Sequence, residues 1–233
     1  MSSALSSESF KPHPLQLAEL TERFLQAWRA LKTMRHRKWG FCDCACRNLI
    51  RNQRRLMKEP LQESEIANEL KKDKAFVQGV DKKGRKIMVL LGARHLTSDR
   101  DLGEFERFGI FLLDKLSSLS GDLDKFVGVI DMKGIGYRNM DIKGFLSGLE
   151  ILQDHYPERL GKLFFVHCPS LFWVIWRICY PFIDPNVREK LVFVDDDGQI
   201  KETLLQDIDI TQLPVEYGGM LPMVPLRNVK APT

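Results

Sequence analysis

The 233-residue sequence lacks an uninterrupted apolar run that could span a bilayer, which takes about 20 residues. Its most apolar stretch, residues 163–183, is broken by the polar His167 and Arg177 and by Pro169 and Pro181. The first residues also lack the basic and then apolar layout of a secretory signal, and the cysteines, five in all, are odd in number. These absences predict no membrane-spanning helix, free thiols and a reducing, cytoplasmic setting.

The motifs of common enzyme classes are also missing. Gly134 and Gly136 are not followed by the third glycine of a dinucleotide fingerprint, because that position is Asn139. The nucleophile elbow of a hydrolase would need a glycine two residues before Ser147, where Phe145 stands instead. We therefore expect a protein that is not an enzyme, with ester hydrolysis as a disfavoured alternative.

No pattern indicates a metal or a cofactor, and we expect neither. Cys42, Cys44 and Cys46 alternate too closely for the usual spacing of zinc ligands. His167 and Cys168 are neighbours in an expected strand, so they should point to opposite faces and form no nucleophile–base pair. We interpret them as a core thiol beside a core or pocket histidine.

Positive charge is concentrated in the N-terminal part of the chain. Residues 1–58 hold 12 Lys and Arg against 4 Asp and Glu, whereas the whole chain has a net charge of +4, so the remainder is net acidic. Such a segment is typical of a solvated helix face or of transient binding to an acidic membrane, where each cation contributes about 1 kcal/mol. Nucleic acid is not an expected partner, because no aromatic stacking platform accompanies the charge.

The spacing of apolar residues predicts an α/β fold with a mainly parallel β-sheet. Strands are expected at residues 76–81, 87–93, 125–131, 162–168 and 191–194. Helices are expected between and after them, at residues 99–119, 142–152, 170–180, 185–190 and 202–206. The strand at 125–131 is apolar on both faces, as central parallel strands are.

Several motifs of this chain resemble the CRAL-TRIO lipid-binding family. Tyr156-Pro-Glu-Arg-Leu-Gly-Lys162 precedes a strand, Tyr180-Pro-Phe-Ile-Asp-Pro185 follows an aromatic helix, and Leu213-Pro-Val-Glu-Tyr-Gly-Gly219 closes the domain. The turn at residues 79–85 and the segment at 129–134 agree in order and spacing. The resemblance implies a parallel sheet that floors a lipid cavity, helices on one side, a mobile gate helix and a small N-terminal helical lobe.

The resemblance also suggests how the chain is divided. Residues 1–14 form a disordered tail, residues 15–64 an atypical basic helical lobe, residues 65–220 the lipid-binding domain and residues 221–233 a C-terminal tail. In the N-terminal lobe the family's usual arginine pattern is only loosely matched, so we assign no site residue there.

The site residues follow from the same likeness. Glu158 and Lys190 match the residues that contact the headgroup in relatives that transfer phosphatidylinositol, because a carboxylate accepts from inositol hydroxyls and an ammonium neutralises phosphate. The residues expected to form the gate helix and to line the pocket are Phe172, Trp173, Trp176, Tyr180, Val127, Val129, Phe165 and His167.

Two departures bear on the choice of headgroup. Val187 replaces a threonine of those relatives, which removes one hydroxyl. Phe126 and Gly128 stand where relatives that also carry phosphatidylcholine have Ser or Thr, so we expect weak or absent binding of the choline headgroup.

The sequence therefore predicts a monomeric lipid-transfer protein that extracts and exchanges a single phospholipid, with phosphatidylinositol as the first candidate. It would associate transiently with acidic membranes as a peripheral membrane protein. Two alternatives stay open. The same fold could bind a sterol, a tocopherol or a retinoid-like molecule, or it could serve as a membrane-associated regulatory adaptor that moves no lipid.

Overall fold

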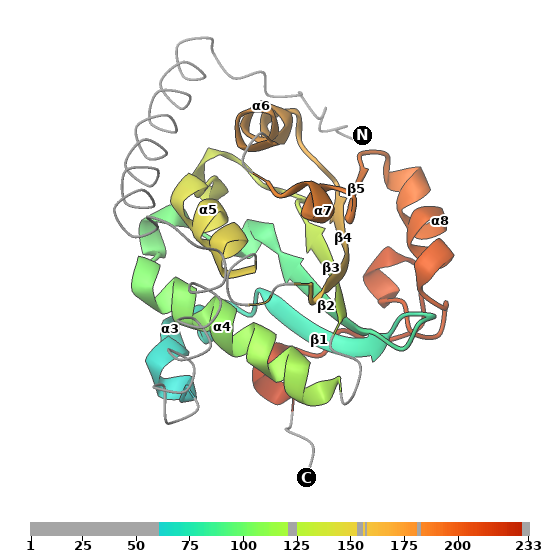
Figure 1. Ribbon diagram of the computed structural model, residues 1–233, viewed down its shortest axis with the longest axis horizontal. Coiled ribbons are helices and arrows are strands. Elements are labelled where there is room, and N and C mark those ends of the chain that lie inside the picture. Colours follow the sequence, from blue (N-terminus) through green and yellow to red (C-terminus); the bar gives the residue numbers. More distant parts are fainter. Residues whose placement is uncertain (1–60, 121–124, 153–155, 157, 181–182, 230–233) are drawn as a thin grey trace, which may run out of the picture. The chain divides into compact units, whose positions relative to one another are not determined.

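A computed structural model of the chain describes residues 61–120, 125–152, 156, 158–180 and 183–229 (Figure 1). In this part five strands form one sheet in the order β1-β2-β3-β4-β5. The strands are β1 (Ala75–Val80), β2 (Lys86–Leu91), β3 (Phe126–Asp131), β4 (Leu160–Val166) and β5 (Leu191–Val194). The first pair is antiparallel and the other three are parallel, which confirms the predicted α/β class with a mainly parallel sheet.

Helices connect the strands and cover the sheet. They are α3 (Ala67–Lys71), α4 (Leu102–Leu119), α5 (Ile142–Glu150), α6 (Ser170–Cys179), α7 (Pro185–Arg188) and α8 (Asp197–Asp207). The last helix begins five residues before the predicted start at 202, because the Asp196 side chain accepts a hydrogen bond from Gly198 N at 2.9 Å and caps it. Short 3-10 turns occur at Glu63–Ile66, Gly92–Arg94, Thr97–Asp99, Tyr137–Asn139, Val215–Tyr217 and Leu226–Asn228.

Each face of the sheet has its own hydrophobic core. Figure 1 shows α4 and α5 on one side of the sheet and α8 on the other. On the first side, Leu163 and Phe165 of β4 pack in one cluster with residues of α4. On the second side, Phe164 of β4 packs in another cluster with Leu204 of α8. The alternation along β4 therefore separates two cores, as the period of two in a strand requires.

The role of α8 in the second core can be tested at Leu204, which is fully buried. We expect Leu204→Ala to lower the free energy of unfolding by about 2–5 kcal/mol, because the substitution leaves a cavity in a packed core. The exposed Gln206 on the same helix provides the control. Gln206→Ala should change the free energy of unfolding by about 0.5 kcal/mol or less. Urea titration monitored by tryptophan fluorescence measures both, and equal effects would contradict the assignment.

Candidate functional site

A cavity of about 290 Å³ lies between the sheet and the helices α4 and α5. This volume is near the lower end of the range of about 300–1,000 Å³ for small-molecule sites. The side chains that line it are mostly aliphatic and aromatic. They include Met88 of β2, Ile130 of β3, Leu163 of β4, Leu112 of α4, Phe145 of α5 and Phe172 of α6. Such a wall suits hydrocarbon, because it offers an apolar ligand contacts without unpaired polar groups.

The cavity uses one set of alternate strand positions. On β3, Phe126 and Ile130 line it, whereas Val127 and Val129 are fully buried in the opposite core with α8. The two valines therefore do not line this cavity, contrary to what the sequence analysis expected of them. Because β3 is apolar on both faces, its sequence does not reveal which parity faces the helices.

Two of the expected pocket residues line the cavity. Phe165 reaches it from β4, and Phe172 reaches it from the first turn of α6. Their ring centroids lie 5.4 Å apart with the planes 29° from parallel. This stacked pair joins the sheet floor to α6 at the edge of the cavity.

The aromatic residues of α6 gather around a residue that the sequence analysis did not select. The ring centroid of Phe193 on β5 lies 4.8 Å from that of Trp176 and 5.2 Å from that of Trp173. Tyr180 follows α6, is 45% exposed, and has the guanidinium carbon of Arg188 4.2 Å from its ring centroid. The sequence offered one signal for Phe193, namely that it is an aromatic residue in a short strand directly after the predicted gate.

Glu158 and Lys190 lie on one edge of the sheet but outside the cavity. Glu158 is exposed, adopts a left-handed φ of +63° and stands two residues before β4. Lys190 directly precedes β5, and its carbonyl accepts a hydrogen bond from Leu163 N at 2.8 Å. The structure therefore brings both residues to the N-terminal ends of neighbouring strands, and neither lines the cavity.

His167 lies at the opposite edge, beyond the end of β4. It adopts a left-handed φ of +55°, so strand alternation does not extend to it and Cys168 as the sequence analysis assumed. Its Nδ1 lies 2.7 Å from Asp131 Oδ1, and the Tyr217 hydroxyl donates to Asp131 Oδ2 at 3.0 Å. His167 is absent from the cavity wall. Its place in this polar cluster indicates that it ties the ends of β3 and β4 to the C-terminal segment.

The surroundings of Cys168 make its thiol a poor nucleophile. Burial and the neighbouring Asp195 carboxylate raise the pKa of Cys168 to about 12. The thiol therefore stays protonated at neutral pH, and its sulfur lies 3.6 Å from the Phe165 carbonyl. Among the described residues, no group of His, Cys, Asp and Glu is arranged to hold a metal ion.

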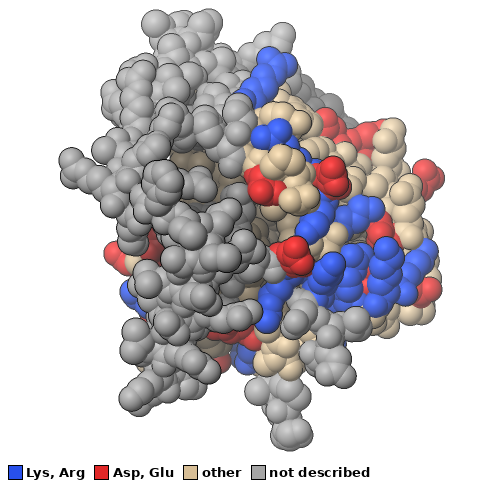
Figure 2. All heavy atoms as spheres, viewed as in Figure 1, with Lys and Arg blue, Asp and Glu red and all other residues tan. Residues whose placement is uncertain are grey.

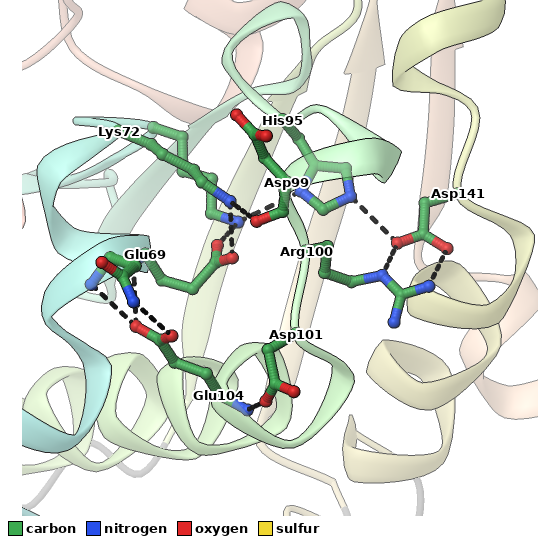
Figure 3. A network of polar contacts seen from close by, with 10 residues as sticks. Glu69, Lys72, His95, Asp99, Arg100, Asp101, Glu104 and Asp141 are labelled. Carbon is green, nitrogen blue, oxygen red and sulfur yellow. Dashed lines mark hydrogen bonds and ion pairs between the residues drawn. The ribbon is translucent and has the colours of Figure 1, made fainter.

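One end of the cavity is backed by charged side chains that the sequence analysis missed. Figure 3 shows His95 and Arg100 pointing at the carboxylate of Asp141. His95 Nε2 lies 3.0 Å from Asp141 Oδ2, and Arg100 donates to Asp141 Oδ1 at 3.1 Å. Asp141 also accepts from Gly144 N at 2.9 Å, which caps α5. A single carboxylate thus fixes α5 to the loop that follows β2.

The chain of charges continues to α3. Lys74, which is buried directly before β1, forms an ion pair with Glu69, and its Nζ lies 3.3 Å from His95 Nδ1. Lys72 donates to the other oxygen of Glu69 at 2.7 Å. Burial alone would raise the pKa of the Glu69 carboxyl, but the two lysines hold it below its usual value. We name this set the charge network; it consists of Glu69, Lys72, Lys74, His95, Arg100 and Asp141.

The charge network should make stability depend on acidity. Burial opposes ionisation of Asp141, but the hydrogen bonds from His95 and Gly144 and the charge of Arg100 hold its pKa below the usual value. A depressed pKa stabilises the fold above the pKa of the unfolded chain, about 3.9 for Asp, and that stabilisation is lost as pH falls through the folded value. We therefore expect the urea midpoint to fall steeply below about pH 4.

Asp141→Asn tests the source of this acid sensitivity. Removal of one partner leaves Arg100 buried without its carboxylate, which should cost about 3–5 kcal/mol of unfolding free energy at pH 7. The loss should shrink as pH falls, because the wild-type carboxyl then becomes neutral as well. Asp99, which is exposed, supplies the control variant Asp99→Asn. An equal pH slope in wild type and Asp141→Asn would contradict this origin.

The fold and the cavity define a class of protein: an α/β domain with an apolar cavity between one sheet face and its helices. Residues 70–219 match the CRAL/TRIO domain, and the chain belongs to this family. The phosphatidylinositol transfer protein CSR1 of Eremothecium gossypii is 30% identical over 155 residues, which cover 66% of this chain and 35% of that protein. Patellin-3 of Arabidopsis thaliana is 28% identical over 208 residues, which cover 82% of this chain and 42% of that protein.

A solved structure supports the fold alone. The crystal structure of Sfh5 superposes with a TM-score of 0.52 at 23% identity, and the match covers 58% of this chain and 53% of that one. The chain spans less than half the length of the curated relatives named above. Within the described ranges, no helix combines the length and the apolar character that a membrane span requires. The expected tail at 1–14 and the basic segment up to Lys58 lie outside the described residues.

Proposed function

We propose that this protein is a lipid-transfer protein without enzymatic activity, which holds the acyl chains of one phospholipid in the cavity between the sheet and α4, α5 and α6. The observation that carries the proposal is the apolar cavity itself. The names of relatives such as CSR1 support phosphatidylinositol as the first candidate for the ligand. The site acts on lipid by enclosing it, and this function requires no catalytic group.

The energetics of transfer require a match to the membrane rather than tight binding. Each CH₂ group removed from water contributes about 0.8 kcal/mol, so a two-chain lipid that crossed water alone would face a barrier of tens of kcal/mol. A cavity wall as apolar as a bilayer removes that penalty without trapping the lipid. Exchange is then nearly neutral in free energy, and the opening of the cavity sets its rate.

We assign the gate to α6 and the segment after it, up to Lys190. The described side chains of α6 contact the sheet through aromatic rings, chiefly around Phe193, and form no hydrogen bond or ion pair with it. Separation of α6 from β5 would therefore expose apolar surface that lipid can cover, and it would leave no buried charge unpaired. A cavity of about 290 Å³ corresponds to the closed form, because two acyl chains need more room.

The headgroup is assigned to the edge that carries Glu158 and Lys190. Lys190 makes no ion pair with any described side chain, so its ammonium is available for the phosphate. The neighbouring Val187 lacks the hydroxyl of phosphatidylinositol-transferring relatives, which leaves the two charged residues as the main contacts. A Cβ at Gly128 would lie 2.5 Å from Leu163 Cδ1, so a hydroxyl-bearing side chain at this position would require Leu163 to shift.

The double variant Glu158→Gln, Lys190→Met tests the headgroup assignment. We expect at least about a tenfold loss in phosphatidylinositol exchange between vesicles, because both charge-assisted contacts disappear. Glu202→Gln, Lys201→Met makes the same chemical change at exposed positions of α8 and should exchange normally. Circular dichroism establishes that both variants fold. Normal exchange by the folded test variant would refute the roles of Glu158 and Lys190.

Occlusion of the cavity tests where the chains lie. Gly148 of α5 lines the cavity, and a Cβ placed on it would meet no described heavy atom within 4 Å. We expect Gly148→Leu to reduce lipid loading severalfold while it preserves or raises thermal stability, since glycine is less favourable in a helix than alanine by about 0.8–1 kcal/mol and leucine ranks close to alanine. Gly148→Ala raises the helix propensity but adds little side-chain volume, so this variant should load lipid normally. Equal loading of both variants, measured by mass spectrometry of extracted lipid, would place the chains elsewhere.

The small volume of the closed cavity favours one second candidate. A sterol, a tocopherol or a retinoid-like molecule requires less opening than a diacyl lipid, so the same fold could carry one of these. Mass spectrometry of the ligand that co-purifies with the full chain separates the two. Loading without exchange between vesicles would instead indicate the membrane-associated adaptor.

A further inference from the structure

The parallel strands begin beside basic residues. Lys86 opens β2, Lys125 directly precedes β3, Arg159 precedes β4 and Lys190 precedes β5. Since all four strands run in one direction, these residues come to the same edge of the sheet. The positions are far apart in sequence, and the topology alone gathers them.

The strand register places these starting points side by side. Lys86 pairs with Phe126, and Phe126 N donates to the Arg159 carbonyl at 2.9 Å. One strand further, Leu163 N donates to the Lys190 carbonyl at 2.8 Å. The residues at which the strands begin therefore follow one another along one end of the sheet, although the Arg159 side chain is held by the Ser117 hydroxyl and the Tyr156 ring.

The turn between β1 and β2 extends the row with Lys82 and Lys83, both exposed. Figure 2 shows Lys and Arg side chains gathered at the lower right of this face, over the region in which Figure 1 draws that turn. We define the basic edge as Lys82, Lys83, Lys86, Lys125 and Lys190. None of these five lysines forms an ion pair with a described side chain at 4 Å or less, but the Lys82 ammonium donates to the Leu205 carbonyl at 2.6 Å at the end of α8.

The acidic side chains at this end of the sheet are too few to neutralise the lysines of the basic edge. Asp81 is buried and pairs with Arg85, and Asp207 pairs with Lys162 at 2.6 Å. The exposed acids that share the edge are Glu158, Glu189 and Asp209, the last of which interacts with the charge of Lys82. At the opposite end of the sheet, β5 runs directly into the exposed Asp195, Asp196 and Asp197. The exposed Lys133 and Arg138 follow β3 at that same end, so charges of both signs occur there.

Large apolar side chains lie exposed next to the turn. Ile210 is 39% exposed and Met220 is 66% exposed, and Met220 N donates to the Ile210 carbonyl at 3.0 Å. The segment that holds them rests on β1 and its turn, since Lys82 N donates to the Asp207 carbonyl at 2.8 Å. In the part of the chain that the structure describes, most exposed large apolar residues fall between 210 and 224.

This combination distinguishes a bilayer from other polyanions. Lysines attract an anionic surface over a distance set by salt, and adjacent exposed apolar side chains enter the headgroup region, where they add a contribution that salt does not screen. A nucleic acid would use the lysines but gain little from Met220, and no aromatic stacking platform lies among these residues.

We propose that the basic edge, together with Ile210 and Met220, forms a docking surface for an anionic lipid bilayer. None of its residues belongs to the basic segment at residues 1–58. It includes Lys190, so the bound protein presents the edge that carries the proposed headgroup residues to the membrane; this last consequence rests on the proposed lipid-transfer function, whereas the docking itself does not.

Sedimentation of the full chain with phosphatidylcholine vesicles, with and without phosphatidylserine, tests the electrostatic part. Lys82→Gln, Lys83→Gln should weaken partitioning onto the phosphatidylserine vesicles by about thirtyfold, from about 1 kcal/mol per lysine. Lys133→Gln, Lys143→Gln removes the same charge at exposed positions outside the edge and should leave partitioning within about twofold. Equal losses in both variants, or no loss in either, would overturn the proposal.

Met220→Ser tests the apolar part. It should lower partitioning onto the same vesicles severalfold, and the deficit should persist at high salt, because apolar insertion is not screened. Retained partitioning by this variant would show that Met220 adds no apolar contact with the membrane. The lysines alone do not distinguish a bilayer from another polyanion, so this result would overturn the proposal. Lipid loading, measured by mass spectrometry, should stay normal in all of these variants, so a failure of docking is distinguishable from a failure of the transfer function.

Discussion

A sheet that is apolar on both faces must be covered on both, and this constraint organises the whole domain. The strands β2 to β4 carry buried or half-buried side chains at every position and no exposed one. On one face α8 and the C-terminal segment pack directly against Val127, Val129 and Phe164. On the other face α4, α5 and α6 surround a space that their side chains leave unfilled. One face therefore supplies stability, and the other supplies the site.

An apolar space of this size inside a folded domain is costly, because a void forfeits packing contacts and the surrounding structure tends to collapse into it. The charge network counters this tendency at one end of the cavity. Asp141 holds the start of α5 through His95 and Arg100, and Glu69 holds Lys74 at the start of β1. Since the separation of any partner would leave a buried charge uncompensated, the charge network resists displacement of the walls at this end, whereas the proposed gate at α6 is held by aromatic contacts alone.

The sequence predicted the elements of this architecture because they depend on local patterns. Apolar periodicity located the strands and helices, and motifs in a fixed order indicated the family. It could not predict the parity of Val127 and Val129, because an all-apolar strand looks alike from either face. The charge network was also invisible, since Lys74 and His95 come together only after β1 and β2 have paired. The cluster around Phe193 likewise depends on how α6 returns over β5.

The direction of the strands links the site to its surroundings. The basic residues at their N-terminal ends include Lys190, which closes the segment that begins with α6, and α7 lies between the two. A membrane that neutralises Lys190 and its neighbours therefore acts on one end of the segment whose other end packs on the cavity through Phe172. Because the aromatic contacts of α6 can be replaced by acyl chains at little cost in free energy, while those of the charge network cannot, the proposed opening of the cavity would occur on the α6 side. Binding at the edge and opening at the wall would then be two steps along one continuous stretch of chain.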